Sequence, residues 1–167
     1  SLRSGRHIYH RIANADVAEI LEGLAQLSPT DHVSRPGQIG AETRQARSCY
    51  NHIAGRLGVL MADRLIALNV LTVRENAISA GPRYQSFLDD IGVEVPHGGT
   101  GKPPAKFCLD WTERRHHISG PLATAIMQRF LEARWLERRT GSRALNITAD
   151  GLGALECLFD LTQQDLD

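Results

Sequence analysis

The sequence predicts a mainly α-helical α+β protein that contains two copies of one small unit of helices and a hairpin. Two observations predict it: a stretch of twenty residues that occurs twice, and strand signals that alternate with amphipathic helices. The 167 residues are 42% hydrophobic and 23% charged, which is typical of a chain that buries a core. No apolar run approaches the ~20 residues that would span a bilayer. The three cysteines are too few for a disulfide framework and favour a reducing, cytoplasmic location.

The N-terminal residues 6–12 alternate between apolar and polar side chains, as a half-buried strand does. A lone strand leaves its backbone groups unpaired, so we expect its partner strand to precede Ser1. Asn14 then caps a helix. Apolar residues at helical spacing form one stripe along this helix: Val17, Ile20, Leu21, Leu24 and Leu27.

This strand and helix, SGRHIYHRIANADVAEILEGLAQL, resemble the wing and the following helix of ArsR-type winged-helix transcriptional repressors. In that family the wing touches DNA and the next helix helps to form the dimer. The resemblance implies that residues 1–27 are a wing remnant and a dimerisation helix. It also implies backbone contacts to DNA from Arg6, His7 and Arg11, and a helix-turn-helix headpiece that this chain lacks. The alternative is a basic strand followed by an ordinary core helix.

Residues 28–46 are rich in Pro and Gly and predict a linker, with a helix that begins near Ala41. Beyond the linker, a shift of 65 aligns residues 52–71 with 117–136 without a gap. Six of the twenty columns are identical, whereas ordinary residue frequencies predict roughly one. The sequence therefore contains an internal duplication.

Each copy predicts a short helix, a longer helix, two strands and a last helix, which is the order of a winged helix. The two winged-helix-like repeats cover 47–97 and 107–167, and a loop at 98–106 separates them. We expect the hairpin of the first copy to be shortened. In the second copy, Arg138, Arg139 and Arg143 flank the hairpin turn, where a DNA-contacting wing would place them. The alternative is a solvated hairpin whose arginines pair with Glu137 or with Asp110 across the copies.

Candidate metal or effector ligands gather in two segments. Cys49 and His52 have a usable two-ligand spacing, and Cys108, Asp110 and His116 offer further soft and hard donors. Against a metal site, His52 and His117 occupy matching positions of the duplication, which favours a repeated structural hydrogen bond.

The segments CYNHIAG and CLDWTERRHHISG also resemble the C-terminal region of ArsR-like regulators that carry a long extension. This resemblance covers nearly the whole chain and makes a metal or metalloid effector a possible cofactor. Trp111 and Trp135 are candidates for lining an apolar pocket between the copies. Cys157 is expected to pack in the core.

Catalysis is not expected, because the sequence carries no HExxH, GxSxG or GxGxxG motif. The types of a Cys–His–Asp triad occur in Cys108, His117 and Asp110, but residue types without geometry are weak support. The sequence predicts the effector-sensing and dimerising portion of a DNA-binding regulator, a homodimer that reaches DNA through the full-length protein. The alternatives are a DNA-contacting extension that senses nothing, and a metal or metalloid sensor.

Overall fold

The structure is a computed structural model that describes residues 1–10, 12–14, 17, 20, 21, 24, 40–75, 77–95 and 103–167. Within these ranges, none of the helices combines the length and the apolarity that crossing a membrane requires. The described strands form two-stranded antiparallel sheets only, and helices connect them. The mixed α+β class is therefore confirmed.

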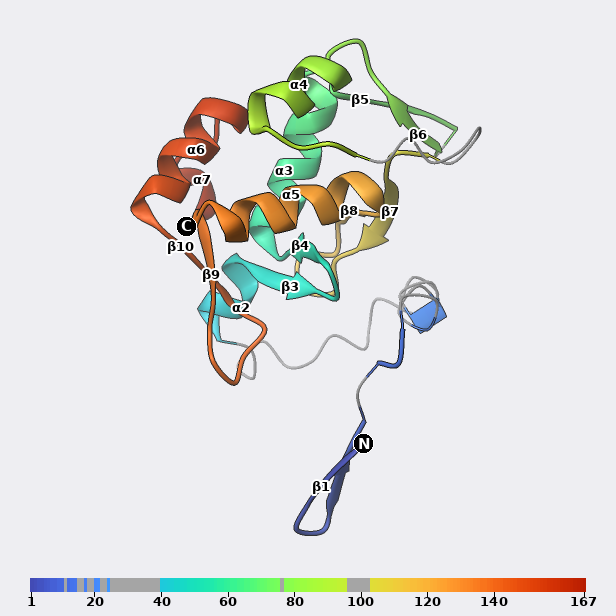
Figure 1. Ribbon diagram of the computed structural model, residues 1–167, viewed down its shortest axis with the longest axis vertical. Coiled ribbons are helices and arrows are strands. Elements are labelled where there is room, and N and C mark those ends of the chain that lie inside the picture. Colours follow the sequence, from blue (N-terminus) through green and yellow to red (C-terminus); the bar gives the residue numbers. More distant parts are fainter. Residues whose placement is uncertain are drawn as a thin grey trace.

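The main body consists of two consecutive units with the same order of elements (Figure 1). The short helix α2 (Ala41–Gln45) precedes them. The first repeat contains β3 (Arg47–Cys49), β4 (His52–Ala54), α3 (Arg56–Ala67), β5 (Leu71–Arg74), β6 (Ala77–Ala80) and α4 (Tyr84–Ile91). The second contains β7 (Lys106–Leu109), β8 (His116–Ser119), α5 (Pro121–Glu132), β9 (Leu136–Arg138), β10 (Leu145–Ile147) and α6 (Ala149–Phe159), followed by α7 (Gln163–Leu166).

The two repeats share backbone conformation as well as element order. Gly55 and Gly120 precede the long helices with φ of 80° and 90°, a region that essentially only glycine adopts. Two residues after the same helices end, Asn69 and Arg134 have φ of 58° and 56°. Because these pairs are 65 residues apart, the duplication seen in the sequence is also a duplication of structure.

Two details of the repeats differ from expectation. Each repeat opens with a hairpin, β3–β4 or β7–β8, where a short helix was predicted. The hairpin β5–β6 of the first repeat is not shortened, because its strands have four residues each and those of β9–β10 have three. Strands this short carry almost no periodicity, which explains both errors. The assignment of the repeats as winged helices stays a prediction.

The N-terminal hairpin is complete within the chain. Strand β1 (Leu2–Ser4) pairs with β2 (His7–Tyr9), and Gly5 provides the positive φ of the turn between them. The expectation that the partner strand precedes Ser1 is therefore wrong. The predicted helix cap is present, since Asn14 Oδ1 accepts a hydrogen bond from Val17 N at 3.0 Å. Most of the predicted linker, and Arg11 and Leu27, lie outside the described residues.

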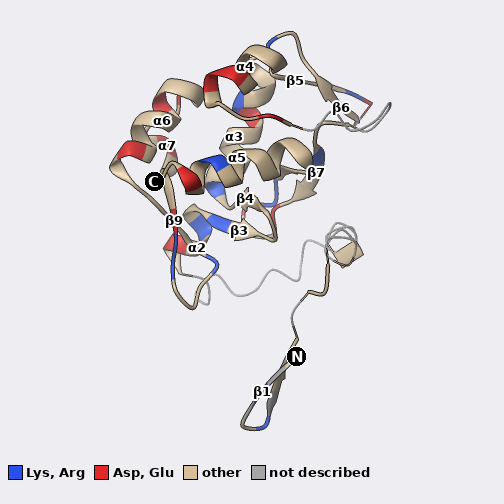
Figure 2. Cartoon of the chain, in the orientation of Figure 1, with Lys and Arg blue, Asp and Glu red and all other residues tan. Residues whose placement is uncertain are grey.

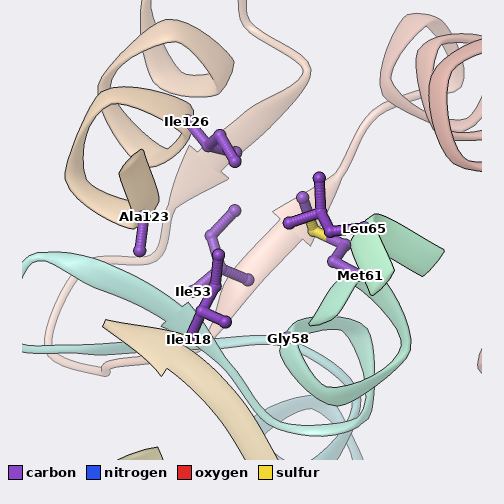
Figure 3. A pocket seen from close by; sticks show the side chains of 7 residues that line it. All are labelled: Ile53, Gly58, Met61, Leu65, Ile118, Ala123 and Ile126. Atoms are coloured by element: carbon purple, nitrogen blue, oxygen red, sulfur yellow. The ribbon is translucent and has the colours of Figure 1, made fainter. Parts of the chain in front are cut away.

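The two repeats interlock around one core. Helix α3 packs on β8 of the second repeat, and α5 packs on β4 of the first. A small cavity of about 10 Å³ lies between them, and Ile53 and Ile118 meet in it from β4 and β8 (Figure 3). This volume is at or below what one water molecule needs, so this part of the interface is packed rather than hollow. The interlocking brings the first hairpin of each repeat, β3–β4 and β7–β8, next to each other.

Candidate metal centre

Each of the two adjacent hairpins presents one cysteine directly opposite one histidine. In the first hairpin Cys49 pairs with His52, and in the second Cys108 pairs with His117. Side chains directly opposite each other in an antiparallel pair lie on the same face of the sheet. Each hairpin therefore offers one sulfur and one imidazole to the same side.

The contact between β4 and β8 brings these two pairs together. One ligand atom from each of Cys49, His52, Cys108 and His117 lies within 4.8 Å of the ligand atoms of the other three. The Nε2 atoms of His52 and His117 are 3.0 Å apart. His52, His117 and Cys108 are almost fully buried, and Cys49 is partly buried. Equivalent residues of the two repeats thus meet at one point, with a pseudo-twofold relation between them.

Both imidazoles have an acceptor on the side away from the cluster. His52 Nδ1 lies 3.4 Å from Asn51 Oδ1, and His117 Nδ1 lies 3.3 Å from Asp110 Oδ2. An oxygen beside Nδ1 favours a hydrogen on that nitrogen, which leaves Nε2 able to accept a hydrogen bond or to bind a cation. Asn51 and Asp110 each follow a cluster cysteine by two residues, so this outer contact is also repeated.

Asp110 is fully buried and connects the second hairpin to the first repeat. Its carboxylate accepts hydrogen bonds from Arg47 Nη2 at 2.9 Å and from the backbone N of Gly55 at 2.7 Å. The hydroxyl and the backbone N of Thr112 donate to it as well. Burial alone would raise the pKa of this carboxyl. His117, the Arg47 guanidinium and Thr112 outweigh the burial, and the pKa of Asp110 lies well below its usual range.

The cluster stabilises a thiolate. A hydrogen bond from the Cys108 thiol, opposed by burial and helped by both imidazoles, lowers the pKa of Cys49 to about 2. Burial lowers the pKa of His117, but contacts with Asp110 and Cys49 more than offset this, so its pKa is raised. The thiolate is the form of cysteine that binds metals, and imidazole binds through its neutral form. The four side chains are therefore suited to a soft or borderline cation.

The structure brings together three of the five residues proposed from the sequence as metal or effector ligands. Cys49, His52 and Cys108 belong to the cluster. Asp110 lies outside it and contacts Nδ1 of the cluster residue His117. His116 is exposed and packs beside the ring of Phe107, with ring centroids 5.2 Å apart. The fourth cluster member is its neighbour His117, which sequence reasoning assigned to a structural hydrogen bond. The signal that could have found it is the duplication itself, because it pairs His117 with His52.

The two tryptophans occupy separate environments. Trp111 lies beneath the guanidinium groups of Arg47 and Arg143, at 4.6 and 5.9 Å from its ring centroid. Trp135 packs edge-on against Phe130 with ring centroids 5.0 Å apart. The expectation for Cys157 is wrong: this residue is exposed, because it lies on the outer side of α6.

The candidate DNA contacts are distributed over two hairpins (Figure 2). Arg6 is exposed in the turn of the N-terminal hairpin; Arg11 and the side chain of His7 lie outside what the structure describes. Arg138 and Arg143 are exposed on the β9–β10 hairpin, whereas Arg139 forms an ion pair with Glu42.

Comparison with known proteins supports one class. No family model matches the chain, and no solved structure matches it. A curated protein of Bacillus subtilis (strain 168), named uncharacterized HTH-type transcriptional regulator YdfF, is 34% identical over 157 residues. The alignment covers 92% of this chain and 70% of that protein. The chain therefore belongs to the family of HTH-type transcriptional regulators that includes YdfF.

Proposed function

We propose that this chain is the effector-sensing and dimerising portion of a DNA-binding transcriptional regulator of the ArsR-like, repressor type, acting in the cytoplasm. The observation that carries the proposal is the match to an HTH-type transcriptional regulator along 92% of the chain. The chain's resemblance to the wing and dimer helix of ArsR-type repressors agrees with that match.

A dimer role for the N-terminal helix rests on its exposed apolar residues. The side chains of Val17, Ile20, Leu21 and Leu24 are 38%, 63%, 49% and 58% exposed. Their spacing places them on one face of a helix. Large apolar side chains gathered on one exposed face mark interaction sites in soluble domains. A second copy of the chain supplies the same apolar face, as a twofold dimer requires.

A sensing role rests on the two-repeat body. The donor cluster lies where the hairpins of the two repeats meet, so anything bound there contacts both repeats at once. A ligand changes the affinity for DNA only when it binds two states of the protein unequally. A ligand that contacts both repeats binds two states unequally when the repeats are arranged differently in those states.

One specific observation favours a second candidate function, direct contact of the body with DNA. Arg138 and Arg143 are exposed residues of the same hairpin, and arginine side chains at exposed positions are the usual contacts to phosphates. In this alternative the repeats lengthen the footprint on DNA without sensing a ligand.

The proposal is tested with the full-length protein and a pool of random DNA duplexes. Selection is expected to enrich a palindromic sequence, because a twofold dimer reads two half-sites. The variant Ile20→Glu/Leu24→Glu is expected to sediment as a monomer and to lose affinity for that sequence. The matched control is Val73→Glu, which changes an exposed apolar residue of β5. Failure to enrich any sequence would contradict the DNA-binding role, and a dimeric Ile20→Glu/Leu24→Glu variant would contradict the dimer helix.

A further inference from the structure

We propose that Cys49, His52, Cys108 and His117 bind one Zn²⁺ ion, which joins the first hairpins of the two repeats. This site is the donor cluster on which the sensing role proposed above rests, and the proposal names the ion bound there; zinc content is measured without DNA, so zinc binding and DNA binding can fail separately. The observations that carry it are the donor set, the positions of the donor atoms, the orientation of the imidazoles and the burial of the cluster.

The donor set is the one that structural zinc sites use. Two cysteine sulfurs and two histidine nitrogens complete a four-coordinate tetrahedral shell, with Zn–S of about 2.3 Å and Zn–N of about 2.0–2.1 Å. Donors at the corners of such a tetrahedron lie roughly 3.3–3.8 Å apart. In the structure the two Nε2 atoms are 3.0 Å apart, and all four donor atoms lie within 4.8 Å of one another. Small side-chain rotations are enough to place them around one ion.

The imidazoles are oriented for coordination by their outer contacts. Asn51 Oδ1 lies 3.4 Å from His52 Nδ1 and Asp110 Oδ2 lies 3.3 Å from His117 Nδ1, so each ring has an oxygen beside Nδ1 and its Nε2 in the cluster. A histidine whose second nitrogen is held by a carboxylate or another acceptor is the usual arrangement at metal sites. The two Nε2 atoms are 3.0 Å apart, within hydrogen-bond distance, so a cation between them would replace a contact in which one imidazole donates to the other.

Burial and charge favour a resident structural ion over a catalytic one. The four side chains fill the coordination shell and leave no position for water or substrate. Two thiolates and one Zn²⁺ sum to zero charge, which suits a buried location, and any proton that the sulfurs or imidazoles still carry leaves to solvent on binding. The nearby buried charges of Arg47 and Asp110 already balance each other at 2.9 Å. The ion therefore adds no net charge to the interior.

The position of the site defines its role. Each repeat supplies one sulfur and one nitrogen, so the two repeats contribute equally to the coordination of the ion. The hairpins that carry the ligands have strands of only three or four residues, and such two-stranded ribbons are marginal alone. The zinc ion cross-links the two hairpins and fixes the geometry of the repeat interface.

The first test uses the wild-type 167-residue chain, purified under reducing conditions without chelator. Elemental analysis is expected to find about one zinc per chain. After zinc removal, titration with Co²⁺ is expected to give visible ligand-field bands of a tetrahedral ion and a thiolate charge-transfer band in the near ultraviolet. A chain without stoichiometric zinc and without the thiolate band on Co²⁺ addition would overturn the proposal.

The second test compares ligand variants with neighbouring controls. Cys108→Ser and His117→Gln are expected to weaken zinc binding at least ~100-fold, because each removes a direct ligand. The controls Cys157→Ser and His116→Gln change an exposed cysteine and an exposed histidine and are expected to stay within about twofold of wild type. Asn51→Ala, which removes only an outer contact, is expected to weaken binding about tenfold. If the controls lose as much zinc affinity as the ligand variants, the assignment of the four ligands is wrong.

Discussion

Arg64 and Arg129 make the same contact from opposite repeats. Arg64 Nε donates to the carbonyl of Phe159 at 2.6 Å, and Arg129 Nε donates to the carbonyl of Ile91 at 2.8 Å. Each arginine lies on the long helix of one repeat, and each carbonyl is the last of the final helix of the other repeat. Arg64 and Arg129 occupy the same column when residues 52–71 are aligned with 117–136. The reciprocal contact explains this identity, because each repeat satisfies the helix-end carbonyl of the other.

This reciprocity predicts that Arg129→Ala and Arg64→Ala each destabilise the protein. Each variant removes a charged hydrogen bond to a helix-end carbonyl, for which we expect a loss of about 1.5–3 kcal/mol in the free energy of unfolding. Urea denaturation followed by circular dichroism measures it. The control Arg74→Ala, at an exposed position of β5, is expected to change stability by less than about 0.5 kcal/mol. An equal effect of Arg74→Ala would refute the cap.

The buried pair of Arg47 and Asp110 predicts a large effect of Asp110→Asn. The variant keeps the size of the side chain but leaves the fully buried Arg47 guanidinium without its counter-charge. Removal of one partner of a buried ion pair costs about 3–5 kcal/mol. The control is Asp63→Asn, which breaks the exposed pair with Arg115 and is expected to cost less than about 1 kcal/mol. Comparable denaturation midpoints for the two variants would contradict this ranking.

The proposed zinc site predicts a metal-dependent melting temperature. Zinc at about 1,000 times its dissociation constant adds about 4.1 kcal/mol of stability to a protein that binds it only when folded. In a domain of this size, about 2–4 °C accompanies each kcal/mol, so we expect chelation to lower the Tm by roughly 8–16 °C. Differential scanning calorimetry with and without chelator measures the shift. The Cys108→Ser variant should show no such dependence; a wild-type Tm that chelator leaves unchanged would argue against zinc as a cross-link.

The two glycines that precede the long helices predict unequal effects of the same substitution. Gly55 and Gly120 both have positive φ, so alanine is strained at either position, at about 1–3 kcal/mol. A Cβ at Gly55 would also lie 2.5 Å from the carbonyl oxygen of Arg44, whereas at Gly120 the nearest atom would be at 3.5 Å. Gly55→Ala is therefore expected to be the more destabilising variant in urea denaturation. The opposite order would mean that α2 does not pack closely against Gly55.

The alternative of direct DNA contact predicts a change in salt dependence. If Arg138 and Arg143 each contact one phosphate, Arg138→Ala/Arg143→Ala lowers the slope of log affinity against log salt by roughly 2 units. Fluorescence anisotropy with the full-length protein and its selected duplex measures this slope. Arg139→Ala is the matched control, because this residue is paired with Glu42. A slope that the double variant leaves unchanged would exclude this contact and favour a purely regulatory role for the hairpin.

The features predicted well from sequence depend on local interactions. The predicted helix cap at Asn14 is present, and Thr148 caps α6 in the same way, where its Oγ1 accepts from Gly151 N at 3.0 Å. Such caps are set by residues three positions apart. The duplication was visible because equivalent positions of α3 and α5 have equivalent packing and so keep the same residue types. The hairpin at β3–β4 was missed because distant contacts support it, among them Ser48 N to the carbonyl of Arg143 at 2.8 Å.

The sequence by itself determined the class of fold, the number of repeats and the spacing of Cys49 and His52, since all three are recorded in local patterns or in self-similarity. Only the tertiary structure decided that Cys108 and His117 complete the cluster, that His116 does not, and that Asp110 supports it from behind. The physical reason is that the four donors come from two hairpins about 60 residues apart in the chain, and that they meet only because α3 packs on β8 and α5 on β4. His116 and His117 have the same chemistry and lie on opposite sides of strand β8. Only His117 lies on the side that is buried against the other repeat.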